Sequence, residues 1–252
     1  MNKRLVPILI ILFFCVGISL SDANTISNMQ YIQQNDSIAI PDSTSLIIVA
    51  DSTVSFNDSL RYTSLTEEDY QRIADKLDVE VAAMKAVVSI EAGSNLSGFL
   101  APGVPLINFD KSVYNSLAKK VKSKTKADPN SQIPEGINSA YGRKEWQQLI
   151  NARKINEEQA NLATFWGMFQ IGGFNYKLCD CKSINEFIDK MSHSEYMQLE
   201  LFAAFITNTN IVKYLKDKNW AAFARKYNGP GYAKRGYHTK MAKAYNKFKN
   251  QK

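Results

Sequence analysis

Glu91 is the residue in this chain best placed for acid–base chemistry. It follows an apolar run in which Met84, Val87 and Val88 recur at the three- and four-residue spacings of one helix face. Gly93 is a natural C-cap for this helix. A carboxyl group at the end of such a face loses hydration, which disfavours its charged form and raises its pKa. It could then act as a general acid near neutral pH. The alternative is a carboxylate that turns to solvent at the helix end.

Histidine and cysteine are too scarce to support most other catalytic chemistries. The chain has two histidines, His193 and His238, and apart from Cys15 only Cys179 and Cys181. These two cysteines are separated by one residue, a spacing at which a disulfide is strained, and they lack the further ligands that a metal site needs. We therefore expect no structural metal, no cofactor and no triad nucleophile, which leaves carboxylates as the acid–base groups.

The first 23 residues have the layout of a secretory signal peptide. Lys3 and Arg4 precede an apolar run from Leu5 to Leu20, and the small residues Ser21 and Ala23 suit cleavage after Ala23. The competing interpretation is an uncleaved membrane anchor, because the run is almost long enough to span a bilayer. We expect an exported protein that acts in the periplasm, the cell envelope or outside the cell, with no membrane contact beyond the export signal.

Residues 24–61 differ in composition from the rest of the chain. Ser, Thr, Asp and Asn dominate there, and the best apolar cluster is Leu46–Val49. So polar a segment buries too little surface to offset its chain entropy, which predicts a disordered tether. The alternative is one or two strands on the edge of a domain, with Leu46–Val49 as the best candidate. Residues 62–252 are predicted to form a single folded domain.

Charge separates these segments further. The whole chain has a formal charge of +7, to which residues 24–61 contribute −3 and residues 62–252 contribute +9. A domain this basic is attracted to polyanions, which for an exported protein are those of the cell wall and membrane surfaces. We expect no nucleic acid partner, because the sequence has no zinc-ligand spacing and no RNA-binding aromatic pattern.

The folded domain is predicted to be mainly helical with a small β-hairpin. Thr66, followed by three acidic residues, predicts the N-terminus of a helix that ends near Leu77. Asp78 is then predicted to cap the helix that ends at Glu91. Pro102–Gly103, between two short apolar runs, predicts a hairpin directly after that helix. A polar loop is predicted over 123–141, and further helices over 111–121, 143–152, 156–163, 183–191, 194–207, 209–217, 219–227 and 237–249.

Three later stretches resemble a known family. They are residues 164–175 (Thr-Phe-Trp-Gly-Met-Phe-Gln-Ile-Gly-Gly-Phe-Asn), 227–232 (Tyr-Asn-Gly-Pro-Gly-Tyr) and 106–111 (Leu-Ile-Asn-Phe-Asp-Lys). Together with the helix that ends in Glu91, and in order from about Leu65 to Phe248, they resemble the N-acetylmuramidase domain of phage endolysins and bacterial cell-wall hydrolases. The first two blocks are also similar to blocks in lytic transglycosylases and goose-type lysozymes.

The resemblance implies a lysozyme-like helical fold and a monomeric enzyme that acts on the glycan strands of peptidoglycan. It would cleave the β-1,4 bond between N-acetylmuramic acid and N-acetylglucosamine, and the family's catalytic glutamate falls on Glu91. The family commonly carries a second acidic residue, usually Glu, at the position of Asp110. The aspartate is one methylene shorter, so two interpretations stay open for Asp110: a catalytic base or stabiliser, or a cap for the helix that begins near Lys111.

The same resemblance supplies candidate substrate-binding residues. The polar tips of four side chains suit N-acetyl and hydroxyl groups, and Gly167 would let the chain approach a sugar closely. These candidates are Trp166, Gly167, Gln170, Tyr227 and Asn228. The apolar members Phe165, Phe169 and Ile171, together with Trp146, are predicted to lie in the core.

Two alternative functions remain at this stage. A lytic transglycosylase would use one glutamate as both acid and base and leave a 1,6-anhydro product. A catalytically inert wall-binding module would need no buried acid, and the helical context of Glu91 argues against it.

Overall fold

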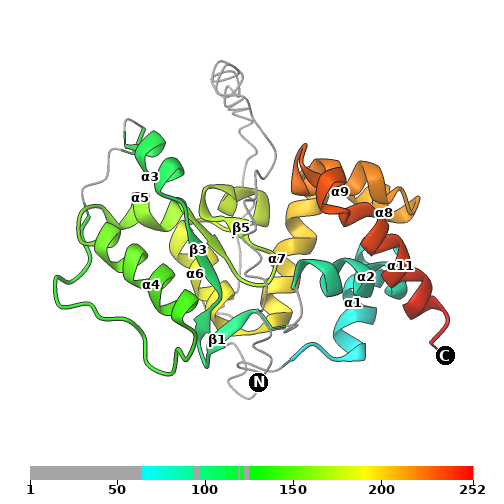
Figure 1. The fold of residues 1–252 in the computed structure, drawn as a ribbon, viewed down its shortest axis with the longest axis horizontal. Coiled ribbons are helices and arrows are strands. Elements are labelled where there is room, and N and C mark those ends of the chain that lie inside the picture. The colour runs from blue at the N-terminus through cyan, green and yellow to red at the C-terminus, as the bar shows by residue number, and fades with distance from the viewer. Residues whose placement is uncertain (1–63, 93–96, 119, 122–124, 252) are drawn as a thin grey trace, which may run out of the picture. The chain divides into compact units, whose positions relative to one another are not determined.

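A computed structural model describes residues 64–92, 97–118, 120–121 and 125–251, all of which belong to one compact unit (Figure 1). The predicted signal peptide, the predicted tether and the predicted Gly93 cap lie outside the described residues. Within them, no helix is both long enough and apolar enough to cross a membrane. The prediction of a mainly helical domain with a small hairpin after the Glu91 helix is confirmed.

The first two helices place Glu91. Helix α1 (Glu67–Leu77) begins with the predicted cap, a capping box in which Thr66 and Asp69 bond each other's backbone N–H groups. The prediction for Asp78 is wrong: this residue is the left-handed C-cap of α1, and its carboxylate pairs with Lys216. Helix α2 (Val81–Glu91) instead begins after Glu80, which makes no side-chain cap.

Short strands follow α2. Strands β1 (Phe99–Ala101) and β2 (Val104–Pro105) form the predicted antiparallel hairpin, and Gly103 takes a positive φ of 72° in its turn. Strand β3 (Ile107–Phe109) pairs instead with β4 (Thr164–Trp166), and β4 pairs with β5 (Ile171–Gly172). The sequence did not predict this three-stranded sheet, which joins the segment that ends at Asp110 to the aromatic block.

Helices enclose the sheet and continue to the C-terminal end of the domain. They are α3 (Lys111–Leu117), α4 (Ala140–Arg153), α5 (Glu157–Leu162), the 3-10 helix η5 (Gly173–Cys179), α6 (Ile184–His193), α7 (Glu195–Asn208), α8 (Val212–Lys216), α9 (Trp220–Asn228), α10 (Tyr232–Arg235) and α11 (Tyr237–Lys249). Helix α7 packs against η5 and α6 and also against α1, and α2 packs against α11 (Figure 1).

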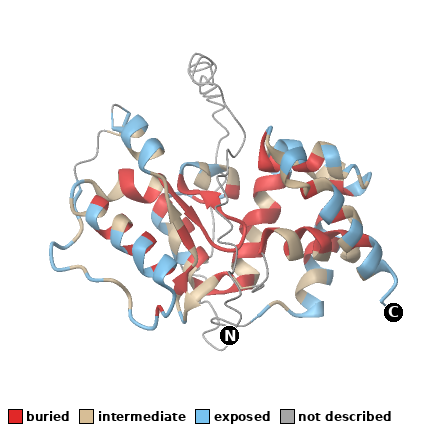
Figure 2. Cartoon of the chain, in the orientation of Figure 1, coloured by how far each residue is buried: buried red, intermediate tan, exposed pale blue. Residues whose placement is uncertain are grey.

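Figure 2 shows that buried positions run through these elements, and many of the buried side chains are aromatic. The rings of Phe169 and Phe202 stack with centroids 4.3 Å apart, and Tyr227 meets Phe202 edge to face. Phe165, Phe169, Ile171 and Trp146 are all buried, which confirms their predicted place in the core. The core therefore joins the aromatic block at 164–175 to α7 and α9.

A single buried glutamine ties the hairpin to the aromatic block. The Gln198 side chain of α7 is fully buried, and its Oε1 accepts a hydrogen bond from the Met168 backbone N–H at 2.7 Å. Its Nε2 donates to the carbonyl oxygens of Met191, at 2.8 Å, and Gly98, at 3.2 Å. Gly167 has no room for a side chain, because a Cβ there would lie 2.7 Å from Gln198 Oε1.

We expect Gln198→Met to lower the free energy of unfolding by about 3 kcal/mol or more, because three buried backbone groups lose their partner at once. Urea denaturation measures the change. The matched control is Gln147→Met on the exposed side of α4, which should change stability by less than about 0.5 kcal/mol. Equal effects of the two substitutions would show that Gln198 has no such role.

Candidate active site

The carboxyl group of Glu91 is buried at the C-terminal end of α2, with 3 % of the residue exposed. It reaches this position because the preceding turns of α2 bury Met84, Val87 and Val88 in the core. Burial raises the pKa of Glu91 to about 7, against the opposing effects of a hydrogen bond from Asn228 and the charge of Arg235. The site therefore holds a carboxylic acid that is half protonated near neutral pH.

Asn228, the last residue of α9, is the hydrogen-bond partner of Glu91. Its Nδ2 donates to both carboxylate oxygens, at 3.1 Å and 3.2 Å. Asn228 is itself fully buried, and its Oδ1 has no hydrogen-bond partner among the described residues. The amide thus holds the acid on one side and offers a buried acceptor on the other.

Two further glutamates, Glu195 and Glu145, are buried, and their hydrogen-bond donors can be compared with those of Glu91. Glu195 accepts backbone N–H bonds from Gly98 and Leu65, at 3.0 Å and 3.2 Å. Glu145 accepts from the Phe109 N–H at 2.9 Å. These carboxylates hold segments of backbone in place, although Glu145 also accepts from the side-chain amide of Gln148 at 3.2 Å. The hydrogen bonds that Glu91 accepts come from the side-chain amide of Asn228. The arrangement at Glu91 suits proton exchange better than structural support.

Arg235 and Tyr237 join the site although sequence reasoning missed both. Arg235 Nη2 donates to the backbone carbonyl of Asn228 at 3.3 Å, and its charge lowers the pKa of Glu91. Burial raises the pKa of Tyr237 to about 12, and the nearby charge of Glu91 adds to the rise. The only available signal was their position, a few residues after the Tyr-Asn-Gly-Pro-Gly-Tyr block.

Asp110 is the N-cap of α3. Its Oδ1 accepts hydrogen bonds from the backbone N–H groups of Ser112, at 2.8 Å, and Val113, at 2.9 Å. Of the two interpretations that the sequence left open, this geometry is that of the cap. The described contacts do not bring Asp110 to Glu91, which is bonded by a residue of α9.

Trp166 is fully buried, and its Nε1 donates to the backbone carbonyl of Asn161 at 3.1 Å. A buried indole whose N–H is bonded to backbone packs in the core. A contact between Trp166 and a sugar stays a prediction.

Gly167 and Gln170 shape the turn between β4 and β5. Gly167 has a φ of 71° and donates its N–H to the Leu106 carbonyl at 2.8 Å. Gln170 is 6 % exposed and donates from Nε2 to the Gly167 carbonyl at 2.8 Å. Both residues thus fix the backbone of the aromatic block, and their predicted contacts with a sugar stay predictions.

Tyr227 connects the aromatic block to Asn228. The residue is 1 % exposed, its hydroxyl donates to the Phe169 carbonyl at 2.8 Å, and its ring stacks on Phe223. Of the five candidate binding residues, Asn228 is hydrogen-bonded to Glu91. Tyr227, the residue before Asn228, fixes the last turn of α9 through its bond to the Phe169 carbonyl.

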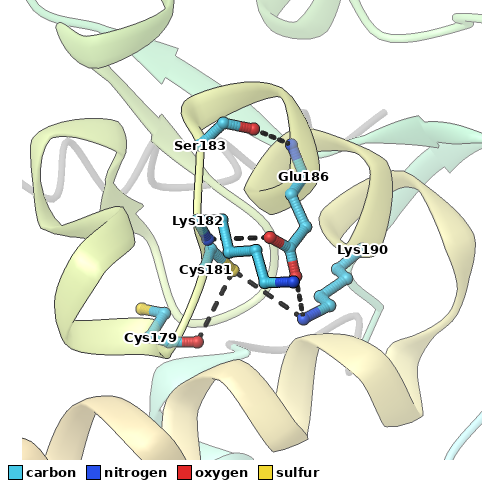
Figure 3. Close-up of polar contacts among 6 residues, drawn as sticks. All are labelled: Cys179, Cys181, Lys182, Ser183, Glu186 and Lys190. Carbon is cyan, nitrogen blue, oxygen red and sulfur yellow. Dashed lines mark hydrogen bonds and ion pairs between the residues drawn. The ribbon is translucent and has the colours of Figure 1, made fainter. Parts of the chain in front are cut away.

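The two cysteines form a separate, unreactive cluster (Figure 3). Cys179 and Cys181 are buried free thiols, and burial raises the pKa of Cys181 to about 11. Lys190 Nζ lies 4.0 Å from Cys181 Sγ and pairs with Glu186 at 2.8 Å. A thiol that stays protonated is a poor nucleophile and a poor metal ligand. Among the described residues, no group of three or more His, Cys, Asp or Glu side chains could hold a metal ion.

Comparison with known proteins agrees with this fold. The family model for N-acetylmuramidase matches residues 80–249, more than half of the chain. The crystal structure of an endolysin from the Burkholderia phage AP3 is 34 % identical to this chain, with a TM-score of 0.62, and the match covers 75 % of this chain and 71 % of that one. A search of curated proteins found no match.

The fold and these matches define a glycoside hydrolase of lysozyme type that degrades peptidoglycan. The chain belongs to the N-acetylmuramidase family.

The raised pKa of Glu91 predicts a pH-dependent loss of stability. Below pH 4.5 the residue is protonated in both the folded and the unfolded state. As the pH rises from 4.5 to about 7, the unfolded chain releases the proton and the folded chain retains it, so the folded state loses stability. Relative to Glu91→Gln, which stays neutral, the wild type should lose about 3 kcal/mol across this window.

Urea denaturation of both proteins at a series of pH values measures the difference. The control is Glu68→Gln in the exposed first turn of α1, whose difference from wild type should change little over the same window. A wild-type-to-Glu91→Gln difference that stays constant from pH 4 to pH 8 would contradict a buried, raised-pKa carboxyl group.

Proposed function

We propose that the chain cleaves the β-1,4 bond between N-acetylmuramic acid and N-acetylglucosamine, with Glu91 as the general acid. The observation that carries the proposal is the burial of Glu91, which raises its pKa to about 7. A group with this pKa is protonated often enough at neutral pH to donate a proton, and it is acidic enough to release it.

Glu91 in its protonated form donates to the glycosidic oxygen as the bond to the muramic acid C1 breaks. The sugar passes through an oxocarbenium-like state, and water adds at C1 to complete hydrolysis. Asn228 stabilises the resulting carboxylate through its two Nδ2 hydrogen bonds. Arg235 supports the same charge state, both through its own charge and through its bond to the Asn228 carbonyl.

Asn228 also has a place in substrate binding in this proposal. Its Oδ1 is a buried acceptor with no partner among the described residues, and a buried acceptor of this kind costs free energy until a donor reaches it. The amide N–H of an N-acetyl group or a sugar hydroxyl is such a donor.

Asp110 has a positioning role in this mechanism. Its Oδ1 accepts from two backbone N–H groups at the start of α3, so a full role as base would compete with the cap. If Asp110 is kept in the cap, Glu91 works without a second carboxylate as nucleophile, and water attacks C1 directly. We further propose that residues 1–23 direct export, because the wall substrate lies outside the cytoplasm.

The central test is digestion of purified peptidoglycan by wild type and by Glu91→Gln, which keeps the shape of the side chain but has no acidic proton. We expect the variant to be slower by roughly a thousandfold, within the range for loss of a general acid. Mass spectrometry of the wild-type products should show reducing-end N-acetylmuramic acid with one water gained for each bond cleaved.

Each other outcome has a clear meaning. Products with 1,6-anhydro-muramic ends would replace hydrolysis by the lytic transglycosylase reaction, and reducing-end N-acetylglucosamine would place the cleavage at the other glycosidic bond. Full activity of Glu91→Gln would remove Glu91 from the mechanism.

Asp110→Ser separates the two interpretations of Asp110. Serine is a good N-cap but has no carboxylate, so it should keep α3 in place and leave kcat within about threefold of wild type. Asp110→Ala, which removes the cap as well, should lower the free energy of unfolding by about 1 kcal/mol. A hundredfold loss of kcat in a stably folded Asp110→Ser variant would make Asp110 a catalytic carboxylate instead.

A further inference from the structure

The positive charge of the domain is concentrated in its last helices. Residues 218–252 contain ten Lys and Arg residues and neither Asp nor Glu, a net charge of +10. Residues 62–217 contain 18 basic and 19 acidic residues, a net charge of −1. The basic character of the domain therefore belongs to one segment, which comprises α9, α10 and α11.

Seven of the described cations of this segment are exposed, and one of them, Lys249, pairs with Glu80. We call the other six, which lie on α9, α10 and α11, the basic face; Figure 2 shows the exposed positions of these helices in pale blue. On α11, the residues Lys240, Lys243 and Lys247 follow one another at spacings of three and four, and so share one side of the helix. Within the described part of the chain, no ion pair involves any residue of the basic face. Its members are Arg225, Lys226, Lys234, Lys240, Lys243 and Lys247.

The basic face differs from an ordinary solvated helix surface. Lysines three and four residues apart on a helix repel one another and destabilise it, and surface helices usually relieve this with acidic residues at the same spacing. Helix α6 of this chain does so through Glu186 and Lys190. Helix α11 has no acidic residue along its length. A helix that keeps an unrelieved repulsion is suited to an anion supplied from outside.

The basic face lies beside the candidate active site. Helix α11 packs along α2, which ends in Glu91, and α9 ends in Asn228, which bonds Glu91. Tyr237 opens α11 close enough to Glu91 to respond to its charge, and the lysine series begins one turn later at Lys240. The lysine series therefore starts beside the end of α2 that carries Glu91 and runs along α2 toward Glu80, which accepts a hydrogen bond from Tyr245 at 2.6 Å.

We propose that the basic face binds the carboxylates of the peptide stems carried by the peptidoglycan substrate. The proposal rests on the proposed function, because it assigns to the face an anionic part of the same polymer. Each stem peptide carries free carboxylates and hangs from a muramic acid of the glycan strand. Several weak contacts with successive stems would hold the strand along the enzyme and raise its local concentration.

The test compares two substrates for one variant. The variant is Lys240→Glu with Lys243→Glu and Lys247→Glu. The substrates are purified peptidoglycan and the same peptidoglycan after its free stem carboxylates have been converted chemically to amides, because enzymatic removal of the stems would free a new carboxylate on each muramic acid. We expect KM for the unmodified peptidoglycan to rise about tenfold at low ionic strength, with kcat unchanged and with unchanged kinetics on the amidated peptidoglycan. Added salt should reduce the difference, since exposed charges are screened within about 10 Å at 0.1 M.

The matched control carries the same change in net charge at three exposed lysines outside the basic face: Lys76→Glu, Lys144→Glu and Lys177→Glu. It should behave as wild type on both substrates. A second variant, with Lys240, Lys243 and Lys247 changed to Gln, removes the charges without adding acidic ones, and it should show the same pattern more weakly.

The outcomes separate this inference from the proposed function. If the wild type cleaves both substrates and the Lys240→Glu triple variant matches it on both, the basic face does not bind stem peptides although the enzyme works as proposed. Equal losses on both substrates, or an equal loss in the control triple variant, would also overturn the inference. If the wild type cleaves neither substrate, the proposed function itself fails.

Discussion

The burial of one carboxyl group is the constraint on which the rest of this structure depends. Glu91 loses hydration because α2 carries it into the core, and this loss raises its pKa to about 7. A buried carboxylate is stable only with hydrogen-bond partners, which explains why α9 ends with an amide at Asn228. The short α10 then returns Arg235 to the Asn228 carbonyl, and α11 covers α2. The C-terminal helices thus complete a site that the second helix begins.

The sequence predicted those parts of the site that depend on local pattern. The period of the α2 apolar residues placed Glu91, and the Pro102–Gly103 turn placed the hairpin. The polar tips of Trp166 and Tyr227 are bonded to the backbone carbonyls of Asn161 and Phe169 inside the core, and the sequence did not predict these bonds. Nothing in the local pattern could show which carbonyl would be near.

Contacts between segments that are far apart in the sequence explain the other features that the sequence did not predict. Tyr237 comes near Glu91 because α11 packs on α2, a contact between segments far apart in sequence. Arg235 lies on α10, which packs on α9 and α11. The pairing of β3 with β4 also joins segments far apart in sequence. For Asp110, the sequence supported a helix cap and a catalytic carboxylate equally. The structure shows the hydrogen bonds of a cap, which Asp110 accepts from two backbone N–H groups. The separation of charge between residues 62–217 and 218–252 was present in the sequence, but its meaning depends on where α11 lies.

The central claim is that Glu91 is an acid whose proton is retained to near neutral pH by burial. Carboxyl-carbon NMR measures this directly: the protein is labelled at glutamate side chains, titrated, and compared with Glu91→Gln to assign the resonance. The account predicts a midpoint near pH 7 for Glu91. A midpoint near 4.5, the ordinary value for a glutamate, would contradict it.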